Sequence, residues 1–262
     1  MRGSVTDQTP DEMQFEINNI ARRMCQSMIF CPMPRMHNGE NSTAKWPWNC
    51  PEEARALYRD CLTFRYRFIP TVYSYAIHGS YTGEPIIRPL FYNHTDRIEL
   101  YAVDDEFYLG DHILVAPVTE KDVTERKVYL PEGEWVNLWT KERYKGDRTI
   151  TAEAPMFTKE GLPMYVKVGG GVAYQPDCTS LYDRVPETLR VELYANDAAE
   201  LILNEGEGVT NRFACKKTGD AFEILAENNT TIDRKYTVVI YAEGKTYTAD
   251  LSVKAGTSEM KR

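Results

Sequence analysis

The sequence predicts a mainly β protein, with an N-terminal α-helical segment followed by two antiparallel β-sandwich domains. Three observations predict this fold class. Apolar residues recur at three- and four-residue steps as far as about residue 82, which is typical of amphipathic helices. Two short runs of strand length follow within Gly83–Val118. From Thr188 onward, runs rich in β-branched and aromatic residues recur about every ten residues, as in a β-sandwich.

The first helix is expected from about Pro10 to Ile29. Thr9 can serve as its N-cap, Pro10 suits the first helical position and Glu12 occupies the capping-box position. One apolar stripe follows and is expected to pack in a core; it consists of Met13, Ile17, Ile20, Met24 and Met28.

A second helix is expected to start at Pro51-Glu52-Glu53 and to end in the glycines Gly79 and Gly83. Pro70 lies inside the pattern and should kink the helix, because proline lacks an N–H group and crowds the carbonyl four residues back. The stripe on its core-facing side comprises Ala54, Leu57, Tyr58, Cys61, Leu62, Arg65, Phe68, Ile69, Val72, Tyr73 and Ala76.

The stretch Gly83–Val118 marks the change from helices to strands. Its two apolar runs, Ile86–Phe91 and His112–Val118, have strand length and β-branched or aromatic content. Pro89 and Pro117 cannot donate a hydrogen bond to a sheet. Each is therefore expected at a strand end, a bulge or a sheet edge.

A hairpin is expected after this stretch, because the turn Pro131-Glu132-Gly133 separates two runs of strand character, Arg126–Leu130 and Glu134–Trp139. Trp135 and Trp139 are an even number of positions apart, so they should share one face of a strand and lie in a sandwich core.

The segment Tyr174–Asp183 is interpreted as a linker. The expected domains are therefore a helical segment at residues 1–82, a proximal sandwich at 83–178 and a distal sandwich at 179–262. The last residues, from Gly256, are expected to be disordered. Strands of the distal sandwich are expected at Leu189–Tyr194, Glu200–Leu203, Phe213–Cys215, Ala221–Leu225, Tyr236–Tyr241 and Thr246–Val253.

Composition narrows the class of protein. The chain has 262 residues, a net charge of −8 and a hydrophobic content of 42%. An acidic chain is a poor partner for nucleic acid or an anionic membrane. No apolar run approaches the roughly 20 residues that span a bilayer, and no secretory segment follows the start. Met1-Arg2-Gly3-Ser4 is similar to a vector-derived leader and is left out of the fold prediction.

The cysteines indicate a reducing compartment. None of the six forms a CxxC pair, and no spacing of cysteine and histidine matches a zinc site. Free thiols and a cytoplasmic location are expected. The six positions are Cys25, Cys31, Cys50, Cys61, Cys178 and Cys215.

Several motifs in order resemble glycoside hydrolase family 31, the α-glucosidase and α-xylosidase family. They are G-x-P-x-x-R-P-L-F from Gly83, D-x-F-x-L-G from Asp105, L-V-A-P-V from Leu114 and V-Y-L-P-x-G-x-W from Val128. The resemblance extends over about residues 10–255. It implies that the helical segment is the remnant of the end of a (β/α)8 barrel, followed by the family's proximal and distal C-terminal sandwiches.

The resemblance also implies a retaining reaction that uses two aspartates, one as nucleophile and one as acid/base. In the family both precede the first segment that aligns here, and nothing in this chain resembles their motifs. No catalytic residue is therefore expected in this chain. The resemblance implies no metal and no cofactor, and no phosphate-cradling glycine loop is present, since Gly169-Gly170-Gly171 opens no helix.

His37 is the main candidate for substrate binding. The segment from Phe30 to His37 resembles the family motif F-x-P-x-x-R-x-H, whose histidine hydrogen-bonds sugar hydroxyls. A neutral imidazole offers one donor and one acceptor, which suits a hydroxyl group. Trp46 and Trp48 are candidates for a platform on which a sugar ring stacks; the alternative is a lid over the protein's own core.

Three further residues are assigned structural roles. Arg35 is expected to tie its loop to several carbonyl groups, because a guanidinium offers several donors. Arg88 lies inside an apolar run and is expected to pair with a buried acid such as Asp105. The carboxylate pairs Glu132/Glu134 and Glu205/Glu207 are interpreted as solvated turn residues.

The expected function is the C-terminal part of a retaining α-glycosidase that acts on α-glucosides or α-xylosides. The rival is a non-catalytic sandwich module that binds carbohydrate or a protein partner. The apolar stripes of the two helices must be covered, by the chain's own sandwiches, by a second copy or by a separate barrel polypeptide. Self-association or a barrel partner is the favoured expectation.

Overall fold

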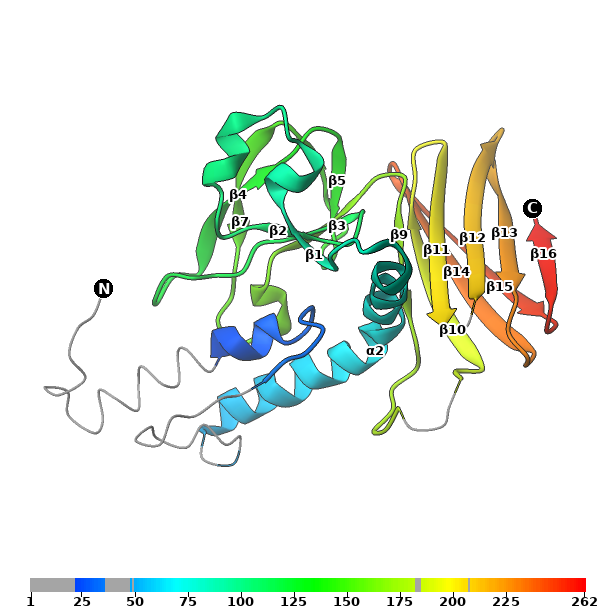
Figure 1. The fold of residues 1–262 in the computed structure, drawn as a ribbon, viewed down its shortest axis with the longest axis horizontal. Coiled ribbons are helices and arrows are strands. Elements are labelled where there is room, and N and C mark those ends of the chain that lie inside the picture. Colours follow the sequence, from blue (N-terminus) through cyan, green and yellow to red (C-terminus); the bar gives the residue numbers. More distant parts are fainter. Residues whose placement is uncertain (1–21, 36–47, 49, 182–184, 207) are drawn as a thin grey trace, which may run out of the picture.

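A computed structural model shows helices at the N-terminal end of the chain and two packed β-sandwiches after them (Figure 1). The structure describes residues 22–35, 48, 50–181, 185–206 and 208–262. Residues 22–27 are helical and form the described end of the first expected helix; the rest of that helix lies outside the described residues.

Helix α2 spans Glu52–Thr82 and confirms the second expected helix. Glu52 and Glu53 lie in its first turn, where negative charge favours the helix dipole. Gly83 ends it in the left-handed conformation, with φ 78°, and donates its N–H to the carbonyl of Gly79. Pro70 is accommodated inside α2, and the ribbon changes direction in the C-terminal half (Figure 1).

The proximal sandwich has a six-stranded sheet in the order β1-β2-β3-β8-β5-β6 and a two-stranded sheet, β4-β7. The six strands are β1 (Ile87–Pro89), β2 (Phe107–Leu109), β3 (Ile113–Val115), β8 (Met164–Lys167), β5 (Glu134–Asn137) and β6 (Arg143–Lys145). The smaller sheet contains β4 (Glu125–Leu130) and β7 (Arg148–Glu153). Short 3-10 helices lie at Leu90–Asn93, Ile98–Ala102 and Lys159–Gly161. Pro89 ends β1 and Pro117 lies beyond the end of β3, as expected.

The expected hairpin between Arg126–Leu130 and Glu134–Trp139 is wrong. β4 pairs with β7, whereas β5 pairs with β6 and β8, so the turn after Leu130 carries the chain from one sheet to the other. Trp135 is fully buried and donates its indole N–H to the carbonyl of Pro131 at 2.8 Å. β5 ends at Asn137, so Trp139 does not share its face; it packs against Phe64 of α2 instead.

The distal sandwich has two four-stranded sheets, β15-β14-β10-β9 and β11-β12-β13-β16. The first contains β15 (Lys245–Val253), β14 (Arg234–Ala242), β10 (Thr188–Tyr194) and β9 (Gly171–Tyr174); the second contains β11 (Ala198–Gly206), β12 (Val209–Thr218), β13 (Ala221–Asn228) and β16 (Thr257–Lys261). All six expected distal strands are confirmed. The sandwich is not wholly antiparallel, because β10 and β14 run parallel.

Two details of the distal region differ from expectation. The segment after Gly256 is not disordered: β16 pairs with β13 along five residues, from Asn228↔Thr257 to Ile224↔Lys261. β9 lies before the expected boundary at residue 178, yet it pairs with β10 in a distal sheet. The chain therefore changes from the proximal to the distal sheets between β8 and β9.

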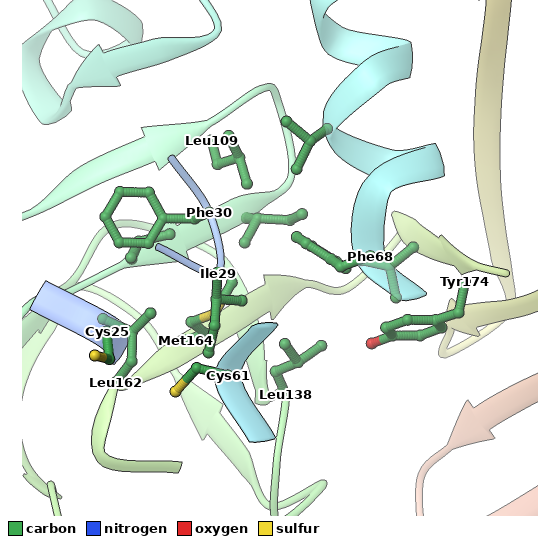
Figure 2. Packing of buried hydrophobic residues seen from close by; sticks show 14 of the residues in the cluster. Cys25, Ile29, Phe30, Cys61, Phe68, Leu109, Leu138, Leu162, Met164 and Tyr174 are labelled. Atoms are coloured by element: carbon green, nitrogen blue, oxygen red, sulfur yellow. The ribbon is translucent and has the colours of Figure 1, made fainter. Parts of the chain in front are cut away.

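Helix α2 lies between the two sandwiches, and its apolar side is buried in the protein's own core (Figure 1). One core cluster joins Leu57, Cys61 and Phe68 of α2 to Ile113 and Val166 of the proximal sandwich and to Val172 and Tyr174 of β9. Figure 2 shows Phe68 beside Tyr174, with Ile29 and Cys61 near Met164. The chain itself covers most of the stripe, whereas Leu62 and Tyr73 are exposed. The expected contact with a second copy or a barrel partner stays a prediction.

None of the helices in the described part of the chain combines the length and apolar character needed to cross a membrane. The six cysteines form no disulfide. Cys25 and Cys61 are fully buried in the core shared by the two helices, and burial raises the pKa of the Cys25 thiol to about 12. Thiols in such surroundings are unreactive.

Candidate functional site

The expected substrate-binding residues lie in and around the segment that joins the two helices. His37 and Trp46 fall outside the described residues, so their assignments stay predictions. Trp48 is described, precedes the start of α2 and is 67% exposed. The described residues on either side of this segment show how its two ends are held.

Arg65 of α2 binds the end of the first helix. Its guanidinium donates to the carbonyl oxygens of Met28 at 2.8 Å and Pro32 at 3.1 Å, and also to that of Cys31. These three carbonyls belong to the turn and loop that follow the helical residues 22–27, and one buried guanidinium can satisfy several carbonyls at once. The side chain is only 9% exposed. Arg65 therefore fixes the point from which the chain departs towards His37.

Arg65 holds several carbonyls at once, whereas the same role expected of Arg35 stays a prediction, because the loop after Arg35 lies outside the described residues. Arg35 itself is exposed. A sequence signal for Arg65 did exist, since it is a charged residue in the apolar stripe of α2. A buried guanidinium needs acceptors, and here the carbonyls that follow the first helix supply them.

The first helix is also fixed to the proximal sandwich. Gln26 donates to the carbonyls of Thr158 at 2.7 Å and Pro155 at 3.0 Å. Arg23 donates to the carbonyls of Val123 at 2.6 Å and Ala154 at 3.1 Å. Phe30, at the start of the F-x-P-x-x-R-x-H motif, is buried with its ring 4.8 Å from that of Phe107 in β2. The first residue of the motif is therefore a core residue that positions the rest.

The expected pairing of Arg88 with Asp105 is wrong. Arg88 is buried and forms ion pairs with Glu84 at 2.9 Å and Asp111 at 2.7 Å, while its Nε donates to the carbonyl of Pro85. Arg88 thus joins the segment after α2 to the turn between β2 and β3. Asp105 instead pairs with Arg126 of β4 at 2.8 Å, which joins β4 to the segment before β2. Both residues are structural, with different partners.

The carboxylates interpreted as solvated turn residues also have fixed partners. Glu134 pairs with Arg143 at 2.7 Å and Glu205 pairs with the fully buried Arg234 at 2.7 Å. Glu207 lies outside the described residues. These two carboxylates therefore neutralise structural arginines.

Glu106 is a buried acid that the sequence did not single out. Its Oε1 accepts the backbone N–H of Tyr129 at 2.9 Å, and Arg126 lies 3.4 Å away. Burial raises the pKa of Glu106 to about 7, because its Oε2 is enclosed without a hydrogen bond and this outweighs the backbone N–H of Tyr129 and the charge of Arg126. Its surroundings are strand backbone rather than a cleft.

Glu192 lies at the junction of the two sandwiches. It pairs with Lys141 at 2.8 Å and with Arg190 at 2.9 Å, and accepts from the hydroxyl of Tyr194 at 2.8 Å. Burial raises the pKa of Glu192, but these three donors outweigh burial and the net shift is downward. Because Lys141 follows β5 and Glu192 belongs to β10, this network joins the proximal to the distal sandwich.

Within the described residues, no group of three histidine, cysteine, aspartate or glutamate side chains could hold a metal ion. The described part of the site therefore consists of anchors: Arg65, Gln26 and Arg23 hold the segment that leads to His37.

Two family models match this chain in order. The Glycosyl hydrolases family 31 TIM-barrel domain matches residues 12–75, and the Glycosyl hydrolase family 31 C-terminal domain matches residues 83–170. The second match begins at Gly83, the residue that ends α2.

Among curated relatives, an α-glucosidase of Saccharolobus solfataricus is 34% identical over 162 residues, which cover 61% of this chain and 23% of that protein. An α-xylosidase of the same organism is 27% identical over 192 residues, which cover 73% of this chain and 26% of that protein. The chain spans about a quarter of the length of these relatives.

Among solved structures, the dextranase FjDex31A of Flavobacterium johnsoniae, complexed with glucose, has a TM-score of 0.77 at 25% identity, over 87% of this chain and 30% of that chain. The α-xylosidase Xac1773 of Xanthomonas citri has a TM-score of 0.80 at 23% identity, over 97% of this chain and 30% of that chain. This second likeness concerns the fold alone.

Proposed function

Because this chain belongs to glycoside hydrolase family 31, as the end of the family's barrel domain followed by its C-terminal region, we propose that it is the C-terminal part of a retaining α-glycosidase. The proposed substrates are α-glucosides or α-xylosides, the classes named for its α-glucosidase and α-xylosidase relatives. His37 would hydrogen-bond sugar hydroxyls and Trp48 would offer a face on which the ring stacks.

One observation carries this proposal: the segment that leads into the His37 motif is held at fixed points. Arg65 binds three carbonyls at its start, and Phe30 is buried against β2. A sugar contact requires a side chain held in place, since small displacements weaken each hydrogen bond. The proposed site therefore has the support that ligand binding needs.

This chain alone is proposed to bind sugar without hydrolysing it. Retaining hydrolysis needs two carboxyl groups about 5–5.5 Å apart, and no motif of this chain resembles those that carry them in the family. The cytoplasmic location expected from the cysteines also stays a prediction.

The rival function, a free-standing module, gains no support from the surface of the distal sandwich. Carbohydrate modules present exposed aromatic rings, because a sugar ring stacks on them. The large apolar side chains exposed in the described part of residues 179–262 are aliphatic, namely Leu181, Val185, Ile202 and Met260.

Saturation-transfer NMR with methyl α-glucoside and methyl α-xyloside tests the sugar contact. Transfer is expected for the unchanged chain, a large loss for His37→Ala and no loss for His78→Ala, which alters a partly exposed histidine near the other end of α2. The absence of transfer to both sugars in the unchanged chain would contradict the proposed contact.

An assay with aryl α-glucoside and aryl α-xyloside should give no turnover. Turnover that persists after host enzymes are removed would contradict the lack of catalytic carboxylates.

A further inference from the structure

The distal sandwich, residues 171–262, lies beyond the residues that either family model matches. No candidate site residue belongs to it, so its contribution to the proposed function is open. Its longest contact with the helical segment is with α2, which packs against β9 and β11. These are the edge strands of the two distal sheets.

Thr71 of α2 forms a two-way contact with β9. Its Oγ1 donates to the carbonyl of Ala173 and accepts the N–H of the same residue, both at 2.8 Å. These are the two backbone groups that a neighbouring strand would otherwise satisfy. Thr71 is 1% exposed, so both groups are out of reach of solvent.

Ser74 repeats this contact on the other sheet. Its Oγ donates to the carbonyl of Ile202 at 3.2 Å and accepts the N–H of Asn204 at 2.8 Å. Both acceptor and donor belong to β11. One turn of α2 therefore binds backbone groups on the edge strands of both distal sheets. The two hydroxyl side chains take the place that a neighbouring strand would have.

The same helix carries Arg65, six positions before Thr71. Six residues correspond to about 9 Å along a helix axis. Three buried residues of α2 form hydrogen bonds with backbone atoms of other elements: Arg65, Thr71 and Ser74. The hydroxyls fix α2 to the distal sandwich, and the guanidinium fixes the segment before His37 to α2.

We infer that the distal sandwich serves the proposed site as an anchor: by holding α2 through Thr71 and Ser74, it keeps Arg65 where it binds the carbonyls of the His37-bearing segment. This role rests on the proposed function for what that segment binds. The distal sandwich therefore acts on that segment through α2.

The physical basis is the cost of leaving these groups without partners. A buried backbone N–H or carbonyl that loses its hydrogen bond destabilises the fold, because it is cut off from water and has no other partner. Replacing both hydroxyls leaves four buried backbone groups of β9 and β11 without a hydrogen bond. A shift of α2 away from these two strands is then favoured, because it lets water bind the four groups. A shift of α2 moves Arg65 with it and weakens the hydrogen bonds to Met28, Cys31 and Pro32.

The test uses Cys31 as a reporter, because its carbonyl is one of the three that Arg65 binds and its side chain is partly exposed. The full chain is treated with N-ethylmaleimide, and labelling of Cys31 is measured by peptide mass spectrometry relative to the exposed Cys178. Thr71→Val with Ser74→Ala removes the anchor. Thr63→Val with Ser80→Ala is the matched control, since both residues are exposed on α2.

The anchored arrangement predicts that Cys31 labels at least threefold faster in T71V/S74A and in Arg65→Met, and at an unchanged rate in T63V/S80A. Hydrogen exchange at Ala173 and Asn204 should rise at least tenfold in T71V/S74A. An unchanged Cys31 rate in T71V/S74A overturns the inference, whether or not exchange at Ala173 and Asn204 rises; so does an unchanged rate in Arg65→Met. If T71V/S74A does not fold, Ser74→Ala alone is judged by the same criteria. Sugar binding is not used, so failure of the proposed function would show separately in the NMR experiment.

Discussion

At the scale of single residues, buried charged and polar side chains connect segments that are distant in sequence. Arg65 joins α2 to the first helix, Arg88 joins the end of α2 to the β2–β3 turn, and Glu192 joins the two sandwiches. Each has several partners, which is how a buried charge is tolerated. Changes at such residues should therefore be costly.

Replacing Arg65 by methionine should lower the free energy of unfolding by about 3 kcal/mol, because three carbonyls lose a charged donor. Arg67→Met is the control. Arg67 is half exposed and makes a single 3.4 Å ion pair with Asp177, so its replacement should cost less than about 1 kcal/mol. Urea unfolding of both variants measures the difference, and equal values would show that Arg65 is no anchor.

Glu106 should make stability fall as the pH rises. In the unfolded chain its pKa is near the ordinary value of 4.5, whereas burial raises it to about 7 in the fold. Between these values the unfolded chain has released a proton that the folded chain still holds, so unfolding becomes more favourable with rising pH. The total effect is about 3 kcal/mol, at about 1.4 kcal/mol for each tenfold change in proton affinity.

Glu106→Gln removes this titration. Compared with the unchanged chain, the variant should therefore gain stability from pH 4.5 to pH 7, and the difference should be constant above pH 7 and below pH 4.5. Urea unfolding at several pH values measures it. A stability difference that does not vary with pH would mean that the pKa of Glu106 is the same in the folded and the unfolded chain.

At the scale of elements, α2 and the turn between β2 and β3 fit together around one glycine. Gly110 has φ 62°, and a Cβ atom there would lie 2.1 Å from the ring of Tyr75 in α2. Gly219, in the β12–β13 turn, has nearly the same φ of 64° but no heavy atom within 4 Å of such a Cβ. Substituting alanine at Gly219 therefore tests the cost of the left-handed backbone alone, whereas the same change at Gly110 adds a steric clash with Tyr75.

Gly219→Ala should cost about 1 kcal/mol, from the left-handed backbone alone. Gly110→Ala should cost more than about 3 kcal/mol, because the new methyl group also displaces Tyr75. Thermal unfolding compares the two variants. If they lose the same stability, the packing of Tyr75 on Gly110 contributes nothing.

The same scale shows what the sequence could predict. Pro51, Glu52 and Gly83 are local signals, and they predicted both ends of α2. The turn after Leu130 is also a local signal, but a turn does not state which strand lies beside the next, and β4 and β5 entered different sheets. β16 was missed because Thr257–Lys261 is polar and becomes a strand only by pairing with β13.

For the proposed site too, local motifs could be found in the sequence and tertiary partners could not. The motif around His37 is local and was found, whereas Arg65 lies 28 positions further along the chain and binds it only in three dimensions. Arg88 lies within four residues of Glu84, yet its second partner, Asp111, is brought close only by the pairing of β1 with β2. The spacing of residues along the sequence does not show which ion-pair or hydrogen-bond partners the tertiary fold will bring together.

At the scale of the whole molecule, α2 and the two sandwiches share one core cluster. α2 contributes to a core that both sandwiches share, and the network of Lys141, Glu192 and Tyr194 crosses the junction. Calorimetry should therefore show a single unfolding transition whose calorimetric and van't Hoff enthalpies agree. Two separate transitions in the unchanged chain would contradict a shared core.

Lys141→Met should weaken this junction. Glu192 would remain buried with one cation fewer, and the loss is expected to be about 2 kcal/mol, below that of a fully buried pair because Lys141 is partly exposed. The single transition should move to lower temperature or separate into two. Lys145→Met, in the neighbouring strand β6, is a control that should leave the transition in place.

The contact of α2 with the distal edge strands also sets an order of events during synthesis. The partner of Thr71, Ala173, is synthesised 102 residues later, and the partner of Ser74, Asn204, is synthesised 130 residues later. At a translation rate of about 5–20 residues per second, α2 emerges from the ribosome roughly 6–26 s before β11 can reach it. During that interval its apolar side is open to chaperones, and the nascent chain is most exposed to misassembly before the distal sandwich has been made.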